Sequence, residues 1–295
     1  MSDTAANLRR KINSAGELDS VVRTMKAVAA SSIGQYENAV RSLDDYYRTV
    51  QLGLSASFRR TELSAFASPM SSPESGAIGA IVFGSDQGLV GRFNEDIVEF
   101  VAHTLKEMPG KKMVWSVGER VQSRLVDTGL HPEGGFNLPS AINAITPLVW
   151  QILMEMEGRR EQGEITQIYL FHNRPKDGAV YAPVSQRLLP LDNQWRHDLA
   201  NIPWPTNNLP EVMNSTEQTL RALIREYFFV SLFRACAESL ASENASRLSA
   251  MQRAEKNIDE LLEDLNRTFH RLRQSGIDEE MFDVVAGFEA LTPAR

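Results

Sequence analysis

Proline placement constrains the fold of this chain more than any other feature of its 295 residues. Twelve of the 13 prolines lie between Pro69 and Pro210, both included, and the remaining one is Pro293. A proline inside a helix removes a backbone hydrogen bond and costs about 3 kcal/mol. The two ends of the chain are therefore free to form long helices, whereas the middle is not.

The first proline-free stretch runs from about residue 5 to residue 66, and its apolar residues recur at steps of three and four. That spacing is typical of a helix that packs on another helix over many turns. Gly16, Gly34 and Gly53 lie inside the stretch, and each weakens a helix by about 1 kcal/mol without ending it. We predict one helical segment within residues 1–68.

The second proline-free stretch runs from about residue 209 to residue 291 and shows the same spacing, for example at Met251, Ala254, Ile258 and Leu261. A helix of about 75 residues is on the order of 115 Å long, which exceeds the diameter of a compact domain of this size. A helix that projects from a domain needs a partner to be stable. We therefore predict that segments 1–68 and 209–295 form one long antiparallel coiled coil.

The middle of the chain, residues 76–201, shows another pattern. Short apolar runs predict strands at Ala77–Gly84, Lys112–Val117 and Thr166–Phe171, with a less regular strand in Val180–Leu189. Helix-like segments, Asn94–Met108 and Ser140–Glu157, lie between them. Strands that alternate with helices of this length indicate βαβ units. The predicted fold class is α/β, with a central Rossmann-like domain and a mostly parallel sheet, bounded by linkers at 71–75 and 201–210.

Composition excludes several classes of protein. The net charge of −7 and the pI near 5.4 argue against a protein that grips phosphate backbones. One cysteine, Cys236, can make neither an internal disulfide nor a zinc site of cysteines alone. The N-terminus lacks the apolar region of a secretory signal, and the longest apolar patch, Tyr227–Phe233, is too short to span a membrane. We expect a cytoplasmic chain whose link to any membrane is made through partners.

The segment Gly84–Asn94, GSDQGLVGRFN, is the sharpest candidate for chemistry because it follows a predicted strand and precedes a predicted helix. Nucleotide-binding folds place a phosphate loop there, but its glycines match neither the dinucleotide fingerprint nor the P-loop. The favoured interpretation is a tight turn with Asn94 or Asp86 as a helix cap. A nucleotide-binding enzyme that uses this turn remains an alternative.

Other catalytic patterns are missing from the sequence. The five histidines show no metal-binding spacing, and no nucleophile elbow occurs. The acidic cluster Asp259, Glu260, Glu263 and Asp264 is better explained as the solvated face of a helix. No catalytic, cofactor-binding or metal-binding residue is predicted. A coiled coil that tethers two partners without turning is a further alternative.

Four segments resemble a known family. They are Val22–Ser31 (VRTMKAVAAS), Ser85–Asn94 (SDQGLVGRFN), Leu240–Met251 (LASENASRLSAM) and Ile277–Leu291 (IDEEMFDVVAGFEAL). In order and spacing they resemble the gamma subunit of F-type ATP synthases, and the resemblance covers nearly the whole chain.

The resemblance implies a rotor shaft without an active site or cofactor of its own. Its terminal coiled coil would lie inside a ring of three alpha and three beta subunits. Its α/β domain would lie against epsilon and the c-ring, at the cytoplasmic face of the membrane. The tip would be Phe282–Leu291. The implied partner-contact residues are Met25, Lys26, Glu243, Asn244, Arg247, Met251, Phe288 and Leu291, although Met25 and Met251 also fit the helical seam.

Two departures from the family pattern indicate a divergent branch, such as the alternative F-type ATPases of some bacteria and archaea. Arg92 stands where the resemblance implies a glycine. The segment Ser31–Glu37 lacks the lysines and arginines that the resemblance implies there, which puts the family's electrostatic contact with the beta subunit in doubt.

Overall fold

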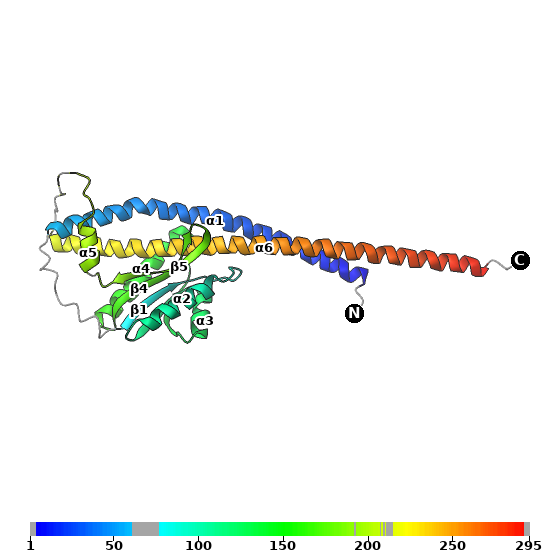
Figure 1. Cartoon of the computed structure of the whole chain (residues 1–295), viewed down its shortest axis with the longest axis horizontal. Coiled ribbons are helices and arrows are strands. Elements are labelled where there is room, and N and C mark those ends of the chain that lie inside the picture. Colours follow the sequence, from blue (N-terminus) through cyan, green and yellow to red (C-terminus); the bar gives the residue numbers. More distant parts are fainter. Residues whose placement is uncertain are drawn as a thin grey trace. The chain divides into compact units, whose positions relative to one another are not determined.

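The structure is a computed structural model, and it describes residues 4–60, 77–191, 193–206, 208, 210 and 215–291. Its elements are α1 (Ala5–Arg60), β1 (Ala77–Phe83), α2 (Phe93–Glu107), β2 (Lys112–Val117), α3 (Glu119–Asp127), β3 (Pro132–Phe136), the 3-10 helix η1 (Ile142–Ala144), α4 (Ile145–Glu161), β4 (Ile165–Lys176), β5 (Ala179–Leu189), α5 (Asn193–Ala200) and α6 (Thr216–Leu291). Figure 1 labels most of them.

The two predicted terminal helices are present and uninterrupted. Helix α1 has 56 residues and continues through Gly16, Gly34 and Gly53, and α6 has 76 residues. Each begins at a hydroxyl cap. The Thr4 Oγ1 accepts a hydrogen bond from the Asn7 amide at 3.4 Å, and the Ser215 Oγ accepts one from the Gln218 amide at 3.3 Å. Such caps satisfy amides that have no partner inside the first helical turn.

The chain divides into two compact units, and both long helices contribute to each. The helix-pair unit comprises the chain up to Val28 and from Leu248, and the main unit comprises Ala29–Arg247. The prediction that the domains are 1–68, 76–201 and 209–295 stays a prediction. No described helix combines the length and the apolar character needed to cross a membrane.

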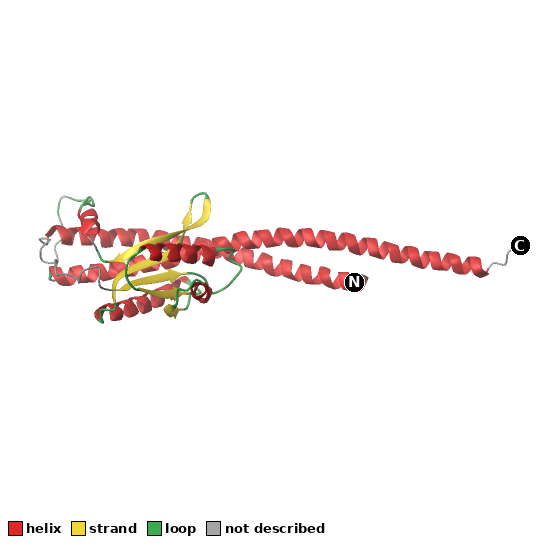
Figure 2. Cartoon of the chain, turned by 60° about the horizontal axis from the view of Figure 1, so that its bottom comes forward, coloured by secondary structure: helices red, strands yellow, loops and turns green. Residues whose placement is uncertain are grey.

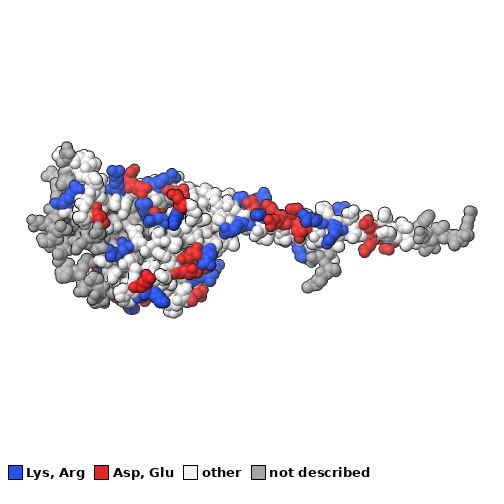
Figure 3. Space-filling model, viewed as in Figure 1, with Lys and Arg blue, Asp and Glu red and all other residues white. Residues whose placement is uncertain are grey.

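Within the helix-pair unit the two helices run antiparallel. Lys26 Nζ lies 2.5 Å from Glu255 Oε2, and Arg23 reaches Glu255 at 3.5 Å and Asp259 at 4.0 Å. Leu8, Ala15 and Met251 are buried along the seam. Basic and acidic side chains are interleaved on the face seen in Figure 3. The predicted antiparallel coiled coil is confirmed.

Toward its end α6 carries large apolar side chains that stay exposed in this chain. They are Ile277, Met281, Phe282, Val284 and Val285, each at least 49% exposed. Exposed apolar groups gathered on one segment are a feature of interaction surfaces.

In the main unit the helices again pair antiparallel, as Figure 1 shows. Asp44 pairs with Arg234 at 3.1 Å, and the Tyr46 hydroxyl donates to Glu226 at 2.6 Å. The helices approach closely at Gly53, where a Cβ would lie 3.0 Å from a Leu223 methyl group. A side chain at that position would require the Leu223 side chain to shift.

One five-stranded sheet, in the order β3-β2-β1-β4-β5, forms the centre of the main unit. The first four strands of that order are parallel, and β5 runs antiparallel to β4 at the edge. The α/β class with a mostly parallel sheet is therefore confirmed. Pro183 lies on the edge strand β5, where a missing amide does least harm to the sheet.

The central strand β1 is buried on both faces, as its continuous apolar run predicts. Ile78, Ala80 and Val82 face the core beneath α2 and α3. Ile81 and Phe83 face a second core, which contains residues of α4, α1 and α6. Figure 2 shows the strands (yellow) with helices on either side. The sheet is thus packed directly against the long helices.

The sequence prediction missed β3, α3 and α5. Strand β3 reads PEGGF, a composition that indicates a turn, and it exists because β2 supplies a parallel partner for it. Helix α4 begins at Ile145 instead of the predicted residue 140, so Pro147 falls in its first turn, where proline is tolerated. The predicted linker 71–75 lies outside the described residues.

Candidate functional site

The predicted phosphate loop, Gly84–Asn94, is a closed turn whose polar groups bind one another. The Asn94 Oδ1 accepts a hydrogen bond from the Ser85 amide at 3.0 Å, and the Asn94 Nδ2 donates to the Ser85 Oγ at 2.8 Å. Gly84 is required, because a Cβ there would lie 2.2 Å from the Cβ of Val121. The Ser85 amide and the Asn94 side-chain amide therefore donate to each other's residue, whereas a phosphate ligand would need such donors to be free.

The expected helix cap is only partly right. Asn94 lies inside α2, whose first turn receives no side-chain cap, so Asn94 holds the loop instead. The Asp86 Oδ1 accepts a hydrogen bond from the Glu119 amide at 2.9 Å, so Asp86 caps the next helix, α3. A side chain that is close to one helix in sequence can cap another once the strands are paired.

Arg92 binds the outer face of α2. Its guanidinium contacts Asp96 and Glu99, each at 3.0 Å. Its φ of −89° is one that any residue adopts. The left-handed conformation in this loop falls instead on Leu89, with a φ of 63° and a side chain that is 63% exposed.

In doubly wound folds, ligands bind beyond the carboxyl ends of the strands, where the strand order reverses. Here that place lies between β1 and β4. Helix α6 covers it, because the Ser246 Oγ donates to the Val90 carbonyl at 2.6 Å and the Ser242 Oγ donates to the Asn173 carbonyl at 3.1 Å. The Asn173 Nδ2 in turn donates to the Phe93 carbonyl at 3.0 Å. The place where the nucleotide-binding enzyme alternative would bind its ligand is therefore covered by α6 of the chain itself.

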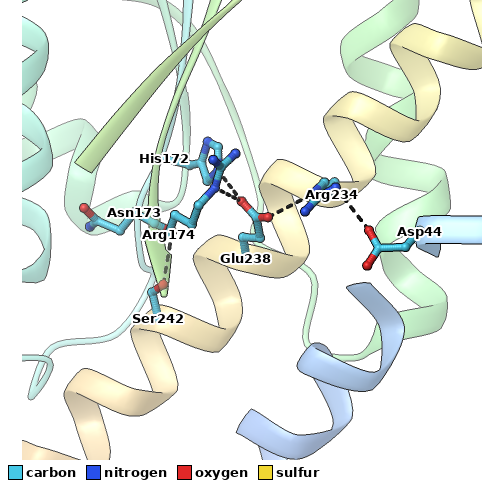
Figure 4. A network of polar contacts seen from close by, with 7 residues as sticks. All are labelled: Asp44, His172, Asn173, Arg174, Arg234, Glu238 and Ser242. Carbon is cyan, nitrogen blue, oxygen red and sulfur yellow. Dashed lines mark hydrogen bonds and ion pairs between the residues drawn. The ribbon is translucent and has the colours of Figure 1, made fainter. Parts of the chain in front are cut away.

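These serines belong to a larger set of contacts on α6, which we call the polar row and define as Arg234, Glu238, Ser242 and Ser246. The four residues are spaced by four, so they follow one side of the helix with a drift of about 40° per step. Figure 4 shows the first three of them with their partners on β4 and α1.

Glu238 is the centre of the row. Its carboxylate lies 2.8 Å from the Nε2 of His172 and accepts hydrogen bonds from the Nε of Arg174 at 2.6 Å and the Nε of Arg234 at 2.8 Å. The Nη1 of Arg234 continues to Asp44 on α1 at 3.1 Å. One carboxylate thus connects β4, α6 and α1 (Figure 4).

The charge states follow from burial. Burial alone would raise the pKa of Glu238, but the hydrogen bonds from His172, Arg234 and Arg174 outweigh it and hold the pKa at about 2. Complete burial lowers the pKa of His172 despite the nearby carboxylate. A neutral His172 donates from its Nε2 to the Glu238 carboxylate, so its Nδ1 carries no proton. The Nδ1 has no partner among the described residues, and it is therefore an unpaired acceptor and not an unpaired N–H donor.

The predicted partner-contact residues Glu243, Asn244 and Arg247 lie in the main unit and contact one another. Arg247 Nη2 lies 2.5 Å from the Glu243 Oε1, and its Nη1 donates to the Asn244 Oδ1 at 3.3 Å. Glu243 and Asn244 are at most 8% exposed. Burial raises the pKa of Glu243, more than Arg247 lowers it. Their role toward a partner stays a prediction.

The other predicted contact residues lie in the helix-pair unit. Met25 and Lys26 are half-buried and Met251 is buried, as the helical seam predicts. Lys26 already pairs with Glu255. The side chains of Phe288 and Leu291 lie outside the described residues. Glu243, Asn244 and Arg247 contact one another, and the partner contacts of all eight predicted residues stay a prediction.

The sequence analysis missed the polar row. A signal was present, since Arg234 and Glu238 are the charged residues of the otherwise apolar or small stretch 230–242, at a spacing that keeps them on one side of the helix. Nothing in the sequence, however, identifies His172 as a partner of Glu238 or Val90 as a partner of Ser246. Among the described residues no group of three potential ligands could hold a metal ion.

The geometry defines a class of protein: an α/β domain of doubly wound type, held by buried polar contacts against an antiparallel pair of long helices. A family model described as ATP synthase matches residues 4–291. The chain therefore belongs to the ATP synthase family.

Curated relatives of this chain include gamma chains. The ATP synthase gamma chain of Anaeromyxobacter sp. (strain K) is 27% identical over 300 positions, which cover 97% of this chain and 98% of the relative. That of Desulfitobacterium hafniense is 26% identical, covering 98% and 99%. That this chain belongs to a divergent branch of the family stays a prediction.

Solved structures share the fold. A chain of the Euglena gracilis mitochondrial ATP synthase, in a structure of OSCP, F1 and c-ring, matches with a TM-score of 0.63 and 15% identity, covering 97% of this chain and 94% of that one. A central-stalk and c-ring structure from Tetrahymena thermophila matches with a TM-score of 0.56 and 21% identity, covering 79% and 99%.

Proposed function

We propose that this chain is the gamma-type central-stalk subunit of a rotary ATP synthase. In that role it turns inside a ring of three alpha and three beta subunits, and it couples ion flow through the membrane sector to ATP synthesis or hydrolysis. The observation that carries the proposal is the match to gamma chains over almost the full length of both proteins.

The physical basis of this function is differential contact. A shaft that presents different faces to three equivalent catalytic subunits shifts the conformational equilibrium of each by the free energy of the contacts it makes there. The exposed apolar side chains of Ile277–Val285 are suited to a protein socket around the end of α6. The chemistry on the nucleotide belongs to the ring, and this chain supplies no cofactor.

The proposed partners are the alpha and beta subunits, epsilon and the c-ring, at the cytoplasmic face of the membrane. The solved structures with this fold support them, since they are described as central stalk, rotor and c-ring assemblies. Met25, Lys26, Met251, Phe288 and Leu291 are proposed as direct contacts. Glu243, Asn244 and Arg247 are proposed to act from within, by shaping the surface of α6 that a beta subunit meets.

The deciding experiment is an affinity purification of the tagged chain from solubilised membranes of its source, with subunit ratios from native mass spectrometry. One copy with three copies of each of two ATP-binding subunits is the expected result. Recovery in a one-to-one complex would instead favour the non-rotary tether. Recovery alone, together with nucleotide binding by the full chain, would favour the enzyme alternative.

A further inference from the structure

The polar row joins α6 to three different parts of the main unit. Arg234 reaches Asp44 on α1, Glu238 reaches His172 and Arg174 on β4, and Ser242 reaches the Asn173 carbonyl. Ser246 reaches the Val90 carbonyl, 156 residues away in sequence. The row therefore connects α6 to α1, to strand β4 and to the loop before α2.

Stability alone does not explain why these contacts are polar. Replacing a buried ion pair by apolar groups of similar volume is often neutral or stabilising. The surrounding interface, which includes Leu232, Phe233, Ala237 and Leu240, is already apolar. An apolar interface resists separation but is non-directional, so it tolerates small rotations and shifts of register. Hydrogen bonds weaken steeply when their angle or length changes.

We propose that the polar row fixes the angular and axial register of the α/β domain on α6, with Glu238 as the principal positioning residue, so that torque passes between domain and helix without slip. This inference rests on the proposed function, because it concerns the coupling of rotation to ion transport. Glu238 holds the central place because its carboxylate binds both Arg174 on β4 and Arg234, which in turn binds Asp44 on α1.

The test uses the complete ATP synthase complex in inverted membrane vesicles. ATP hydrolysis and the membrane potential that it generates, followed with a potential-sensitive dye, give a coupling ratio that does not depend on which ion is pumped. For Glu238→Gln we expect hydrolysis to persist while the ratio falls by about threefold, within the range of substitutions along a coupling path. An unchanged ratio in an assembled complex would overturn the proposal.

The matched control is Glu217→Gln, on the same helix and in the same unit. Glu217 pairs only at the surface, with Arg221 one turn away, so its loss should leave the ratio at the parental value. If Glu238→Gln prevents assembly, the double variant S242A/S246A removes two neutral hydrogen bonds and keeps every charge. It should lower the ratio by about twofold, and a parental ratio would count against the row.

A third variant separates positioning from stability. The triple variant H172L/R174M/E238L replaces the polar contact by apolar groups and should restore the melting temperature lost in Glu238→Gln, without restoring coupling. Recovery of both together would show that the row only holds the fold. Absence of this chain from the parental complex, or a parental complex that does not pump, would overturn the proposed function itself and the inference with it.

Discussion

The substitution Glu238→Gln has a stability effect whose size and pH dependence follow from the structure. The Glu238 side chain is 6% exposed and its carboxylate lies among Arg174, Arg234 and His172. Removing one partner from a buried charged cluster costs about 3 to 5 kcal/mol, because the remaining groups lose their partner but stay buried. Arg174 and Arg234 are partly exposed, so we expect a value near the lower end, about 3 kcal/mol at pH 7.

The pH dependence has a definite sign. The pKa of Glu238 is about 2 in the folded chain, against 4.5 for an ordinary glutamate, so the unfolded chain binds more protons between these values. Its contribution is present above pH 4.5 and is lost as the pH falls toward 2. With these values about 2 kcal/mol disappears between pH 5 and pH 3. The gap in unfolding free energy between parent and Glu238→Gln should narrow by about that amount.

Urea denaturation of the full chain, followed by circular dichroism, measures this gap at pH 7, 5 and 3. His172, with its lowered pKa, also destabilises the fold as the pH falls below 6.5, and it does so more in Glu238→Gln, because the carboxylate that raises the pKa of His172 is then gone. The comparison is therefore made with His172→Leu in both proteins, which removes this contribution. A gap below about 1 kcal/mol at pH 7, or one that stays constant down to pH 3, would refute the assignment of Glu238 as an ionised, buried partner.

Three further predictions follow from single contacts. Gly84→Ala should destabilise the main unit by about 2 kcal/mol or more, because the new Cβ would collide with Val121. The control Gly158→Ala, in open space on α4, should be neutral or stabilising, and urea denaturation of both variants measures the difference. Lys26→Ala should lower the melting temperature of the helix pair in low salt, because Lys26 pairs with Glu255 and holds the pKa of that carboxyl below its usual value. This loss should vanish in high salt, which screens the pair. An equal loss at every salt concentration would mean that packing is responsible. Cys236 is completely buried, which raises the pKa of its thiol, so it should react with a thiol reagent only when the chain unfolds; rapid reaction in the folded chain would show that α6 opens there.

Local patterns predicted most of the elements. The proline-free ends with their three-and-four spacing predicted α1 and α6, and the run Ala77–Gly84 predicted the central strand to within one residue. Elements whose stability depends on a neighbour were missed. The PEGGF strand has no strand-like composition, and the short helix α3 owes its place to packing beneath the sheet and to the distant cap Asp86.

The functional residues also divide into those that the sequence predicted and those that depend on contacts with distant parts of the chain. Segments such as Leu240–Met251 could be matched to a family from sequence, and the family assignment holds over residues 4–291. Glu243 and Asn244 were predicted from the sequence as partner-contact residues, which stays a prediction, but the sequence did not show that both are buried in the main unit. A helical sequence reports spacing, but it does not report which side of the helix the rest of the chain will cover.

The sequence by itself determined where long helices can exist and which segments of the middle form buried strands, because these depend on backbone hydrogen bonding and on local spacing of apolar side chains. Only the tertiary structure decided that the Gly84–Asn94 turn closes on itself and that α6 covers the crevice beside it. It also decided that Glu238 is a buried junction and not a solvated charge. The physical reason is that the state of a polar side chain depends on its partners, and the partners of Glu238 and Ser246 lie 64, 66 and 156 residues away.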